Sequence, residues 1–542
     1  MMVNKRLVGR SSNNRLGTTT TMTGSEHNVN MAPLQGVPQP LSQLRAQQEN
    51  QNSPNQQQQQ IQNKYEEETT VVTPKTFHFV FTLDCKDPAQ DWLGYVFLYS
   101  FVSSGQVGEV TQIVTGCGKG GPRQQALQQQ FETQIIQVLA ADPTTTTTTE
   151  DVKNSGTTSH SSPSSSSSRF HIHFAPAHPE QEKVGGLRVH LKYFNKAAGL
   201  QHWMEEVVGY SDGTDSTKHD DTVIVVMDAD MVILRPFEDG FDHKTELWKV
   251  TLEETIAQGG IAKQVQHGRP MAQHSSYAFP WWTAVDDKNI QTLPPRVSEG
   301  ITKLQSLTGR DIDQHYSAGL PFLLTMKDFY PLVQLWNQST YPLYQVLGEK
   351  ILREPHGPYN LAAAVLQQPA QLASTFSVND FHDAGLNIFH SLLNPVADSH
   401  GNKKSIPTCR EYPQHLKPHI LNYSKRYALG DSFIIGKHYV PVDFVGHPST
   451  SCGQALFVDP PATIAMEGKN YYIDPEINNA QVPIQEPQKV HQMAFLLCET
   501  IQALNGAAIH FKQHHCTATN NDGQETTVNM KKTRIGNDNN NG

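Results

Sequence analysis

The chain has too few apolar residues for all of it to fold. Of its 542 residues, 37% are hydrophobic, against about 45–50% in an average globular protein. The deficit lies in three low-complexity stretches rich in Gln, Asn, Ser, Thr or Gly, at 1–73, 142–168 and 517–542. Such stretches cannot bury enough apolar surface to offset the entropy of ordering them. We therefore expect a disordered N-terminus, a disordered insert and a disordered tail around one ordered domain at 74–516.

Long apolar runs and an excess of positive charge are also missing. The longest runs, such as Val223–Met227, fall far short of the about 20 residues of a membrane-spanning helix. The first thirty residues are basic without an apolar stretch, so no signal peptide or signal anchor is predicted. With 52 acidic and 42 basic residues, the chain lacks the basic footprint of a protein that binds nucleic acid.

Cysteine is scarce, and its spacing excludes two kinds of site. There are six cysteines and no C-x-x-C pair, which argues against a zinc ribbon and a thioredoxin-type centre. The even number is compatible with disulfides in an oxidising compartment, and buried free thiols explain it equally well. Cys498 and Cys516 are about five helical turns apart, too far to pair along one straight helix.

Apolar strands alternate with amphipathic helices in the first half of the ordered region. Strands are predicted at Phe77–Leu83, Val110–Thr115, Phe170–Phe174 and Thr222–Met227. Helices are predicted at Asp91–Ser103, Gln124–Leu139 and within Leu187–Val208, and later at Asp328–Trp336, Tyr359–Gln367 and Val490–Phe511. This order predicts a doubly wound, Rossmann-like α/β sheet. In such sheets ligands bind beyond the carboxyl ends of the strands.

The fourth predicted strand ends in two aspartates, Asp228 and Asp230. Carboxylates at i and i+2 can face one way if the backbone turns, and they then offer hard oxygen ligands to Mg²⁺ or Mn²⁺. A cation held there can bind the two phosphates of a nucleotide sugar. The alternative is a capped turn between two strands, with both side chains bound to backbone N–H groups.

The segment Val223–Phe237 resembles the metal-binding strand of GT-A glycosyltransferases. More narrowly, it is similar to the peptidyl hydroxyproline arabinosyltransferase and peptidyl serine galactosyltransferase group. Further segments resemble this group in the same order, namely Phe81–Cys85 with Asp91-Trp92, Asn195-Lys196 with Leu200 and Trp203, Gly319–Asp328 with Leu335-Trp336, and Glu354–Tyr359 with Ala362–Ala364. The resemblance implies a GT-A fold, a mixed and mainly parallel sheet flanked by helices.

The resemblance also assigns roles to residues. It implies a uridine pocket at Thr82, Leu83 and Asp84. Residues near the ribose or diphosphate would be Asn195, Lys196 and Lys437. Asp228 and Asp230 would hold the metal, with Asp230 favoured for direct ligation. Glu354 would face the donor and acceptor, although a glutamate complementing a helix dipole is an equal alternative.

The third metal ligand departs from the pattern. The group has a His-Tyr pair here, whereas this chain has Asn422-Tyr423, and the nearest histidine is His419. Either His419 ligates after a shift of register, or Asn422 supplies an amide oxygen, or the site is impaired.

Together these features predict an enzyme that uses a UDP-sugar and Mn²⁺ or Mg²⁺. By its resemblance to the group, it would transfer the sugar to a hydroxyl of a hydroxyproline- or serine-rich protein with retention of configuration. The group is typically held in the Golgi. The alternative is a glycosyltransferase-like protein that binds nucleotide or peptide without turnover. Trp281-Trp282 is interpreted as core packing, with an acceptor platform as the alternative. His171 and His173 are interpreted as lying on a solvated strand edge, with a metal site as the less favoured alternative.

Overall fold

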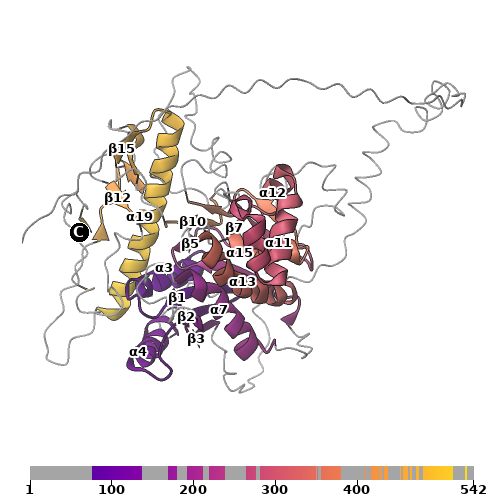
Figure 1. Ribbon diagram of the computed structural model, residues 1–542. Helices are drawn as coiled ribbons and strands as arrows, with labels where there is room; N and C mark the ends of the chain where they lie inside the picture. Colours follow the sequence, from indigo (N-terminus) through magenta and orange to yellow (C-terminus); the bar gives the residue numbers. More distant parts are fainter. Residues whose placement is uncertain are drawn as a thin grey trace, which may run out of the picture. The chain divides into compact units, whose positions relative to one another are not determined.

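The computed structural model describes residues 76–136, 139, 169–179, 192–210, 219–237, 264–275, 281–348, 351, 356–379, 409, 417–424, 427–429, 433–436, 452, 456–461, 464–466, 471–474, 480–516 and 532–533 (Figure 1). The chain divides into two units, Met1–Thr73 and Pro74–Gly542, and every described residue belongs to the second. Apart from Lys532–Thr533, the predicted N-terminus, insert and tail therefore lie outside the described residues.

Within the described residues, a seven-stranded sheet has the order β3-β2-β1-β4-β7-β6-β8. Its strands are β1 (Phe77–Asp84), β2 (Glu109–Thr115), β3 (Phe170–Ala175), β4 (Val223–Asp228), β6 (Met271–His274), β7 (Ala318–Thr325) and β8 (Gln371–Ala373). The first four strands are mutually parallel, β7 runs antiparallel to β4 and β6, and β8 is parallel to β6. The predicted fold class, a mixed and mainly parallel α/β sheet flanked by helices, is confirmed.

Helices cover both faces of this sheet. Gly94 of α3 (Ala89–Ser103) lies against Gln112, whereas Gly199 of α7 (Lys192–Trp203) lies against Ile113. Since neighbouring residues of a strand point to opposite faces, α3 and α7 lie on opposite sides of the sheet. At both glycines the neighbouring side chains are close enough that a β-carbon would crowd them. Glycine therefore permits the close approach of each helix.

The remaining helices extend these two layers. They are α4 (Pro122–Gln130), α10 (Asp287–Thr292), α11 (Pro295–Ser306), α12 (Gly309–His315), α13 (Met326–Leu347), α15 (Gly357–Val365) and α19 (Pro487–His515), with the π-helices η1 (Phe131–Ile136) and η3 (Met204–Val208) and the 3₁₀-helices η5 (Trp281–Ala284) and η8 (Ile464–Met466). α13 packs against α7, α15 and the sheet, and α19 packs against α3. No helix among the described residues is long and apolar enough to span a membrane.

Smaller sheets complete the fold. A three-stranded sheet joins β5 (Met231–Ile233), β10 (Ile420–Asn422) and β9 (Ser377–Val378). Three two-stranded sheets pair β11 (Tyr427–Leu429) with β12 (Phe433–Ile435), β13 (Leu456–Phe457) with β16 (Lys532–Thr533), and β14 (Tyr471–Asp474) with β15 (Ala480–Pro483). β16 lies in the tail that the sequence predicts to be disordered, so two tail residues pair with the domain.

All six cysteines are paired, as Cys85–Cys117, Cys409–Cys498 and Cys452–Cys516. Of the two explanations that the sequence leaves open, the structure supports disulfides. It also confirms that Cys498 and Cys516 do not pair with each other.

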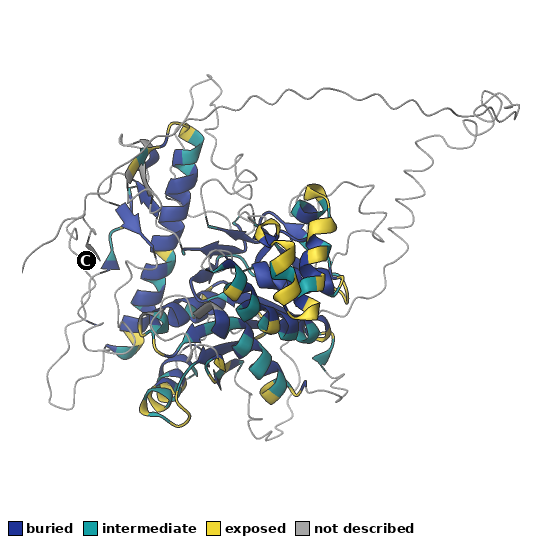
Figure 2. Ribbon diagram, viewed as in Figure 1, coloured by how far each residue is buried: buried dark blue, intermediate teal, exposed yellow. Residues whose placement is uncertain are grey.

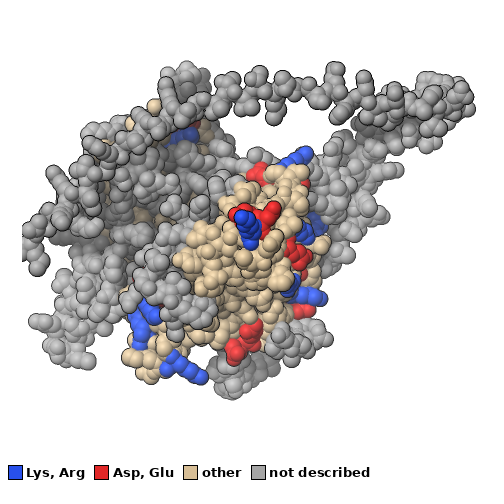
Figure 3. Space-filling view, viewed as in Figure 1, with Lys and Arg blue, Asp and Glu red and all other residues tan. Residues whose placement is uncertain are grey.

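The core follows the central sheet and the helices on it, whose ribbons are largely buried (Figure 2). Trp281 and Trp282 belong to this core, with 3% and 5% of their surfaces exposed. Their interpretation as packing residues is therefore supported over an exposed acceptor platform. On the face in Figure 3, acidic and basic side chains of the described residues are interspersed and form no single basic patch.

Candidate functional site

In a sheet with this strand order, a ligand crevice is expected between the carboxyl ends of β1 and β4. From β1 the chain proceeds outward to β2 and β3, and then returns so that β4 pairs with the other side of β1. At such a reversal the loops after the two strands diverge and leave room for a ligand. Thr82 of β1 is the register partner of Asp228 of β4. The structure thus brings the predicted uridine-pocket and metal-binding segments together at this crevice.

The end of β1 is held in place by local contacts. The Asp84 N–H donates to Gln90 Oε1 at 2.7 Å, and its carboxylate accepts from the Lys86 N–H at 2.9 Å. The next residue forms the Cys85–Cys117 disulfide, which ties the end of β1 to the loop after β2. Leu83 is buried, whereas Thr82 and Asp84 are half-buried. These contacts and the disulfide fix the backbone at the carboxyl end of β1.

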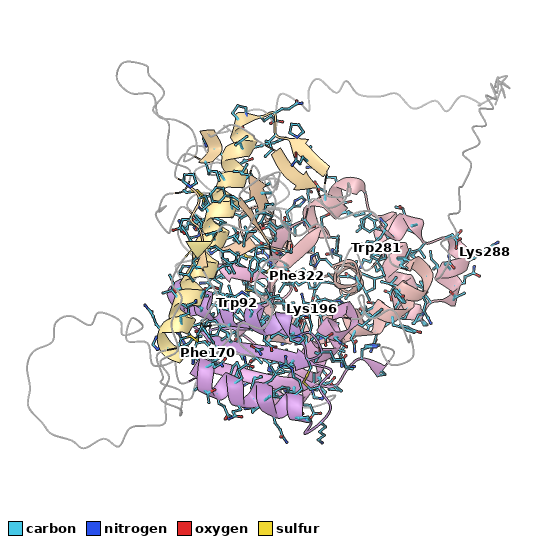
Figure 4. All side chains as sticks on the ribbon, turned by 90° about the vertical axis from the view of Figure 1, so that its left-hand side faces the viewer. Trp92, Phe170, Lys196, Trp281, Lys288 and Phe322 are labelled. Carbon is cyan, nitrogen blue, oxygen red and sulfur yellow. A yellow bond between two sulfur atoms is a disulfide. The ribbon has the colours of Figure 1, made fainter. Side chains whose placement is uncertain are left out.

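Asp228 forms an ion pair with Lys196 of α7. The Lys196 side chain is 12% exposed and the Asp228 side chain is 36% exposed. α7 packs on β1, β2 and β3, so the lysine reaches the crevice from the helix layer; it is labelled near the middle of Figure 4. Asn195, beside it, is 1% exposed, and its Oδ1 accepts from the His178 N–H at 2.9 Å.

Asp230 lies in the tight turn between β4 and β5 and is 7% exposed. Its carbonyl accepts from the Tyr423 N–H at 3.0 Å. Burial, and after it the negative charge of Asp230, raises the pKa of the Tyr423 hydroxyl well above its usual value. Asp228 borders the open pocket described below, whereas Asp230 is not among its lining residues.

The register of β10 with β5 decides which candidate for the third metal ligand, Asn422 or His419, lies nearest the two aspartates. β10 runs antiparallel to β5, with Asn422 opposite Met231 and Ile420 opposite Ile233. His419 precedes Ile420 and lies on the side away from the turn. At ~3.3 Å per residue, its backbone is about 10 Å from that of Asn422. Asn422 therefore lies next to the Asp228–Asp230 turn, and its Oδ1 accepts from the Ser424 N–H at 2.9 Å.

His419 is engaged elsewhere. Its Nε2 accepts from Arg235 Nη2 at 2.6 Å, and its Nδ1 donates to the Pro236 carbonyl at 3.0 Å. The ring also stacks on Phe237, with centroids 4.5 Å apart and an interplanar angle of 8°. Whichever ring nitrogen bound a metal would first have to give up its partner, because both are engaged. Of the two alternative ligands, the geometry favours Asn422.

A pocket of about 430 Å³, counting its open mouth, extends from Asp228 toward β6, β7 and α15. Asp228 is its one carboxylate among the described residues, and most of the other lining groups are neutral hydrogen-bonding side chains. The lining comprises Asp228, Met231, Gln273, His274, Ser275, Gly319, Leu320, His356, Ser377, Asn379 and Asn422. Such a wall suits a neutral ligand with several hydroxyl groups.

Two histidines of this pocket are absent from the sequence-based candidates. His356 is the N-cap residue of α15. Its ring packs nearly perpendicular to that of Phe322, with centroids 5.7 Å apart, and forms no hydrogen bond to a described residue. Burial, and then the nearby Lys196 ammonium, lowers its pKa to about 4, so it is neutral at pH 7. His274 Nε2 lies 3.0 Å from Asp313 Oδ1. His356 belongs to the Glu354–Tyr359 segment, whose resemblance to the group could have pointed to it. No sequence pattern pointed to His274.

Two predicted site residues, Glu354 and Lys437, lie outside the described residues. Among the described residues, no group of three or more His, Cys, Asp and Glu side chains is placed to hold a metal ion. Two carboxylates and one amide, from Asp228, Asp230 and Asn422, nevertheless form an all-oxygen set of the kind that Mg²⁺ and Mn²⁺ accept. The donor chemistry fits such an ion.

Comparisons with known proteins found no matching protein family and no matching curated protein. Among solved structures, the galactosyltransferase LgtC with donor and acceptor sugar analogues is 10% identical, with a TM-score of 0.28, over 64% of this chain and 87% of that one. An active-site mutant of LgtC is 9% identical, with a TM-score of 0.28 and the same coverage. The bifunctional glycosyltransferase WbbM is 9% identical, with a TM-score of 0.27, over 66% of this chain and 47% of that one.

Proposed function

We propose that this chain is a metal-dependent glycosyltransferase of the GT-A type. It would transfer a sugar from a UDP-sugar to a hydroxyl of hydroxyproline or serine in a protein. One observation carries the proposal. The segments that resemble the nucleotide-binding and metal-binding motifs of that group, around Thr82 and Asp228, are register partners at the crevice where the strand order reverses. A binding crevice is expected at that place on physical grounds alone.

The proposed roles follow from position. Thr82, Leu83 and Asp84 would contact the uridine, while Asn195, Lys196 and Lys437 would contact the ribose or diphosphate. Asp228, Asp230 and Asn422 would hold Mn²⁺ or Mg²⁺. A divalent ion there supplies positive charge that stabilises the leaving diphosphate.

The donor sugar would occupy the pocket beyond Asp228, with Glu354 facing the donor and acceptor. In the proposed reaction the acceptor hydroxyl oxygen bonds to the anomeric carbon while the bond from that carbon to the diphosphate breaks. The acceptor proton passes to the departing phosphate oxygen, and attack from the same face retains the configuration. This chain's residues would serve by holding both reactants in place and by excluding water.

The three disulfides support a secretory location, because disulfides persist mainly in oxidising compartments. We propose the Golgi, where a hydroxyproline- or serine-rich acceptor protein would pass.

Release of UDP tests the proposal. The purified chain is incubated with Mn²⁺, a hydroxyproline or serine peptide, and UDP-galactose, UDP-arabinofuranose or UDP-xylose. At least one donor is expected to give UDP release that depends on both peptide and metal. Asp228→Asn and Asp230→Asn should abolish it, whereas the exposed Lys327→Gln should not. Release that persists in both aspartate variants would contradict the metal assignment.

A second candidate is a protein that binds the nucleotide without turnover. Asn422 at the position of the group's histidine favours it, because the metal site then departs from the ligand set of the group that the chain resembles. UDP binding that depends on Mn²⁺, without release from any donor, would support this candidate over the first. Introducing the missing ligand by Asn422→His would then be expected to raise the metal affinity.

A further inference from the structure

Lys196 is a nearly buried ammonium with one described partner. Its side chain is 12% exposed, and its recorded hydrogen bond and ion pair both go to Asp228 Oδ1. Asp228 is also the pocket-facing aspartate of the candidate metal site. The same carboxylate is thus the counter-ion of a lysine and a candidate ligand of a divalent cation.

A divalent cation at Asp228 would compete with Lys196 for the carboxylate and would repel its ammonium group. The lysine would lose its counter-ion and would face a second positive charge at close range. Its own side chain is 12% exposed, so its charge would be left largely uncompensated by water, which is unfavourable. The neighbouring His356 cannot replace the lost anion, since its imidazole carries either no charge or a positive one.

An anion near Lys196 removes this obstacle. The lysine side chain has a flexible four-carbon stem, so its ammonium can turn from Asp228 to a phosphate without movement of α7. A diphosphate in the crevice would then neutralise Lys196 and leave Asp228 available. The ion and the diphosphate would also attract each other directly.

We propose that Lys196 couples the two ligands, so that a divalent cation binds tightly only together with a diphosphate. This proposal rests on the proposed function, since it takes the diphosphate of a nucleotide sugar as the anion. It goes further in assigning Lys196 as the positioning residue that keeps Asp228 from the cation until the donor arrives. Binding of the two ligands is then reciprocal, and each strengthens the other by the same factor.

The test measures binding of Mn²⁺ itself and needs no turnover. Free Mn²⁺ is followed by electron paramagnetic resonance as the full chain is titrated, alone, with uridine, and with UDP. A titration without protein corrects for Mn²⁺ that UDP binds in solution. For the unaltered chain we expect UDP to tighten Mn²⁺ binding roughly 5- to 150-fold, the usual range of such couplings. Uridine, which has no phosphate, should leave it unchanged.

Lys196→Met should bind Mn²⁺ alone more tightly than the unaltered chain, and UDP should then add less. Lys196→Arg, which keeps the charge, should preserve the coupling. Lys327→Met is the matched control, because its side chain is 61% exposed and its ion pair with Asp220 lies outside the candidate site. It should behave like the unaltered chain.

Two results would overturn the proposal. The first is equal Mn²⁺ affinity of the unaltered chain with and without UDP, at UDP concentrations that a separate calorimetric titration shows to be bound; it needs no variant to be folded. The second is a folded Lys196→Met chain with unchanged Mn²⁺ affinity and unchanged enhancement by UDP. Failure of the proposed function gives a different result, namely no binding of UDP to the unaltered chain at any Mn²⁺ concentration.

Discussion

His356 lines the pocket beside Asp228, and its ring forms no hydrogen bond to a described residue. Its ring edge meets Phe322 on one side and opens to the pocket on the other. Because it is neutral at pH 7, it can both donate and accept one hydrogen bond. A sugar hydroxyl can use both.

We predict that His356→Phe weakens UDP-sugar binding roughly tenfold, since one hydrogen bond contributes about 1–1.5 kcal/mol. UDP affinity should stay nearly unchanged, because UDP lacks the sugar. Isothermal titration with UDP and with the best donor measures both. His171→Phe, on the edge strand at the other end of the sheet, is the control. Equal losses for UDP and UDP-sugar would refute a sugar-contacting role.

A pair of histidines away from the site, His173 and His202, is expected to make the stability depend on pH. His173 Nε2 and His202 Nδ1 are 2.8 Å apart, and burial, followed by repulsion from His202, lowers the pKa of His173 to about 4. The unfolded chain binds a proton near pH 6.5, whereas the folded chain does so only near pH 4.

Stability present above pH 6.5 is therefore expected to fall as the pH drops toward 4, with no further contribution from this group below that. Removing the imidazole in His173→Gln should make the melting temperature less dependent on pH across this window. Melting curves at half-unit steps from pH 4 to 7.5 check this. If the two chains lose stability in parallel, another group is responsible.

At the scale of whole elements, the Cys85–Cys117 disulfide stands out because of its position. It joins the carboxyl ends of β1 and β2 directly beside Asp84, at the proposed nucleotide crevice. Cys452–Cys516 instead ties the end of α19 to a distant segment. The two disulfides should therefore share a stabilising effect and differ in their effect on binding.

We predict that Cys85→Ala combined with Cys117→Ala lowers the free energy of unfolding by about 2–4 kcal/mol, as removal of a native disulfide typically does. It should also weaken UDP binding. Cys452→Ala combined with Cys516→Ala should lower stability and leave UDP affinity nearly unchanged. Denaturant titration and calorimetry on both pairs provide the comparison. Equal UDP affinity in the two folded variants would contradict the positional argument.

The elements also show what the sequence could and could not predict. Strands β1 to β4 were predicted to within about two residues, because each is a short apolar run between clear breaks. α13 was predicted to end at Trp336, yet it continues through Pro342 to Leu347. Its buried face outweighs the one hydrogen bond that a proline removes. β7 was not predicted, since its eight residues are all buried and show no alternation.

The candidate site divides in the same way. Thr82 and Asp228 lie at the carboxyl ends of two strands of the predicted doubly wound sheet, so sequence alone could place them at the same edge. His274 and His356 reach the pocket through the antiparallel pairing of β7 with β4 and β6. No local pattern specifies that pairing. The choice of Asn422 over His419 depends on the register of β10 with β5, which is also a long-range property.

At the scale of the whole chain, the predicted insert can be tested by shortening it. η1, before residues 142–168, contacts β3, which follows them, so the two ends of this stretch lie close together. A short connection can therefore span them. Each halving of a flexible loop recovers only about 0.6 kcal/mol of closure entropy, so little change in stability is expected from the loop itself.

We predict that a chain of residues 74–542, with 142–168 replaced by a short Gly/Ser linker, melts at the same temperature as the full chain or slightly higher. It should also bind UDP equally well, because every residue of the candidate site is retained.

A second chain ending at residue 516 loses β16, which pairs with β13 through only two residues, and should be only slightly less stable. Melting curves and UDP titration compare the three chains. A shortened chain that fails to fold would contradict the prediction and would show that residues 1–73 or the insert contribute to the domain.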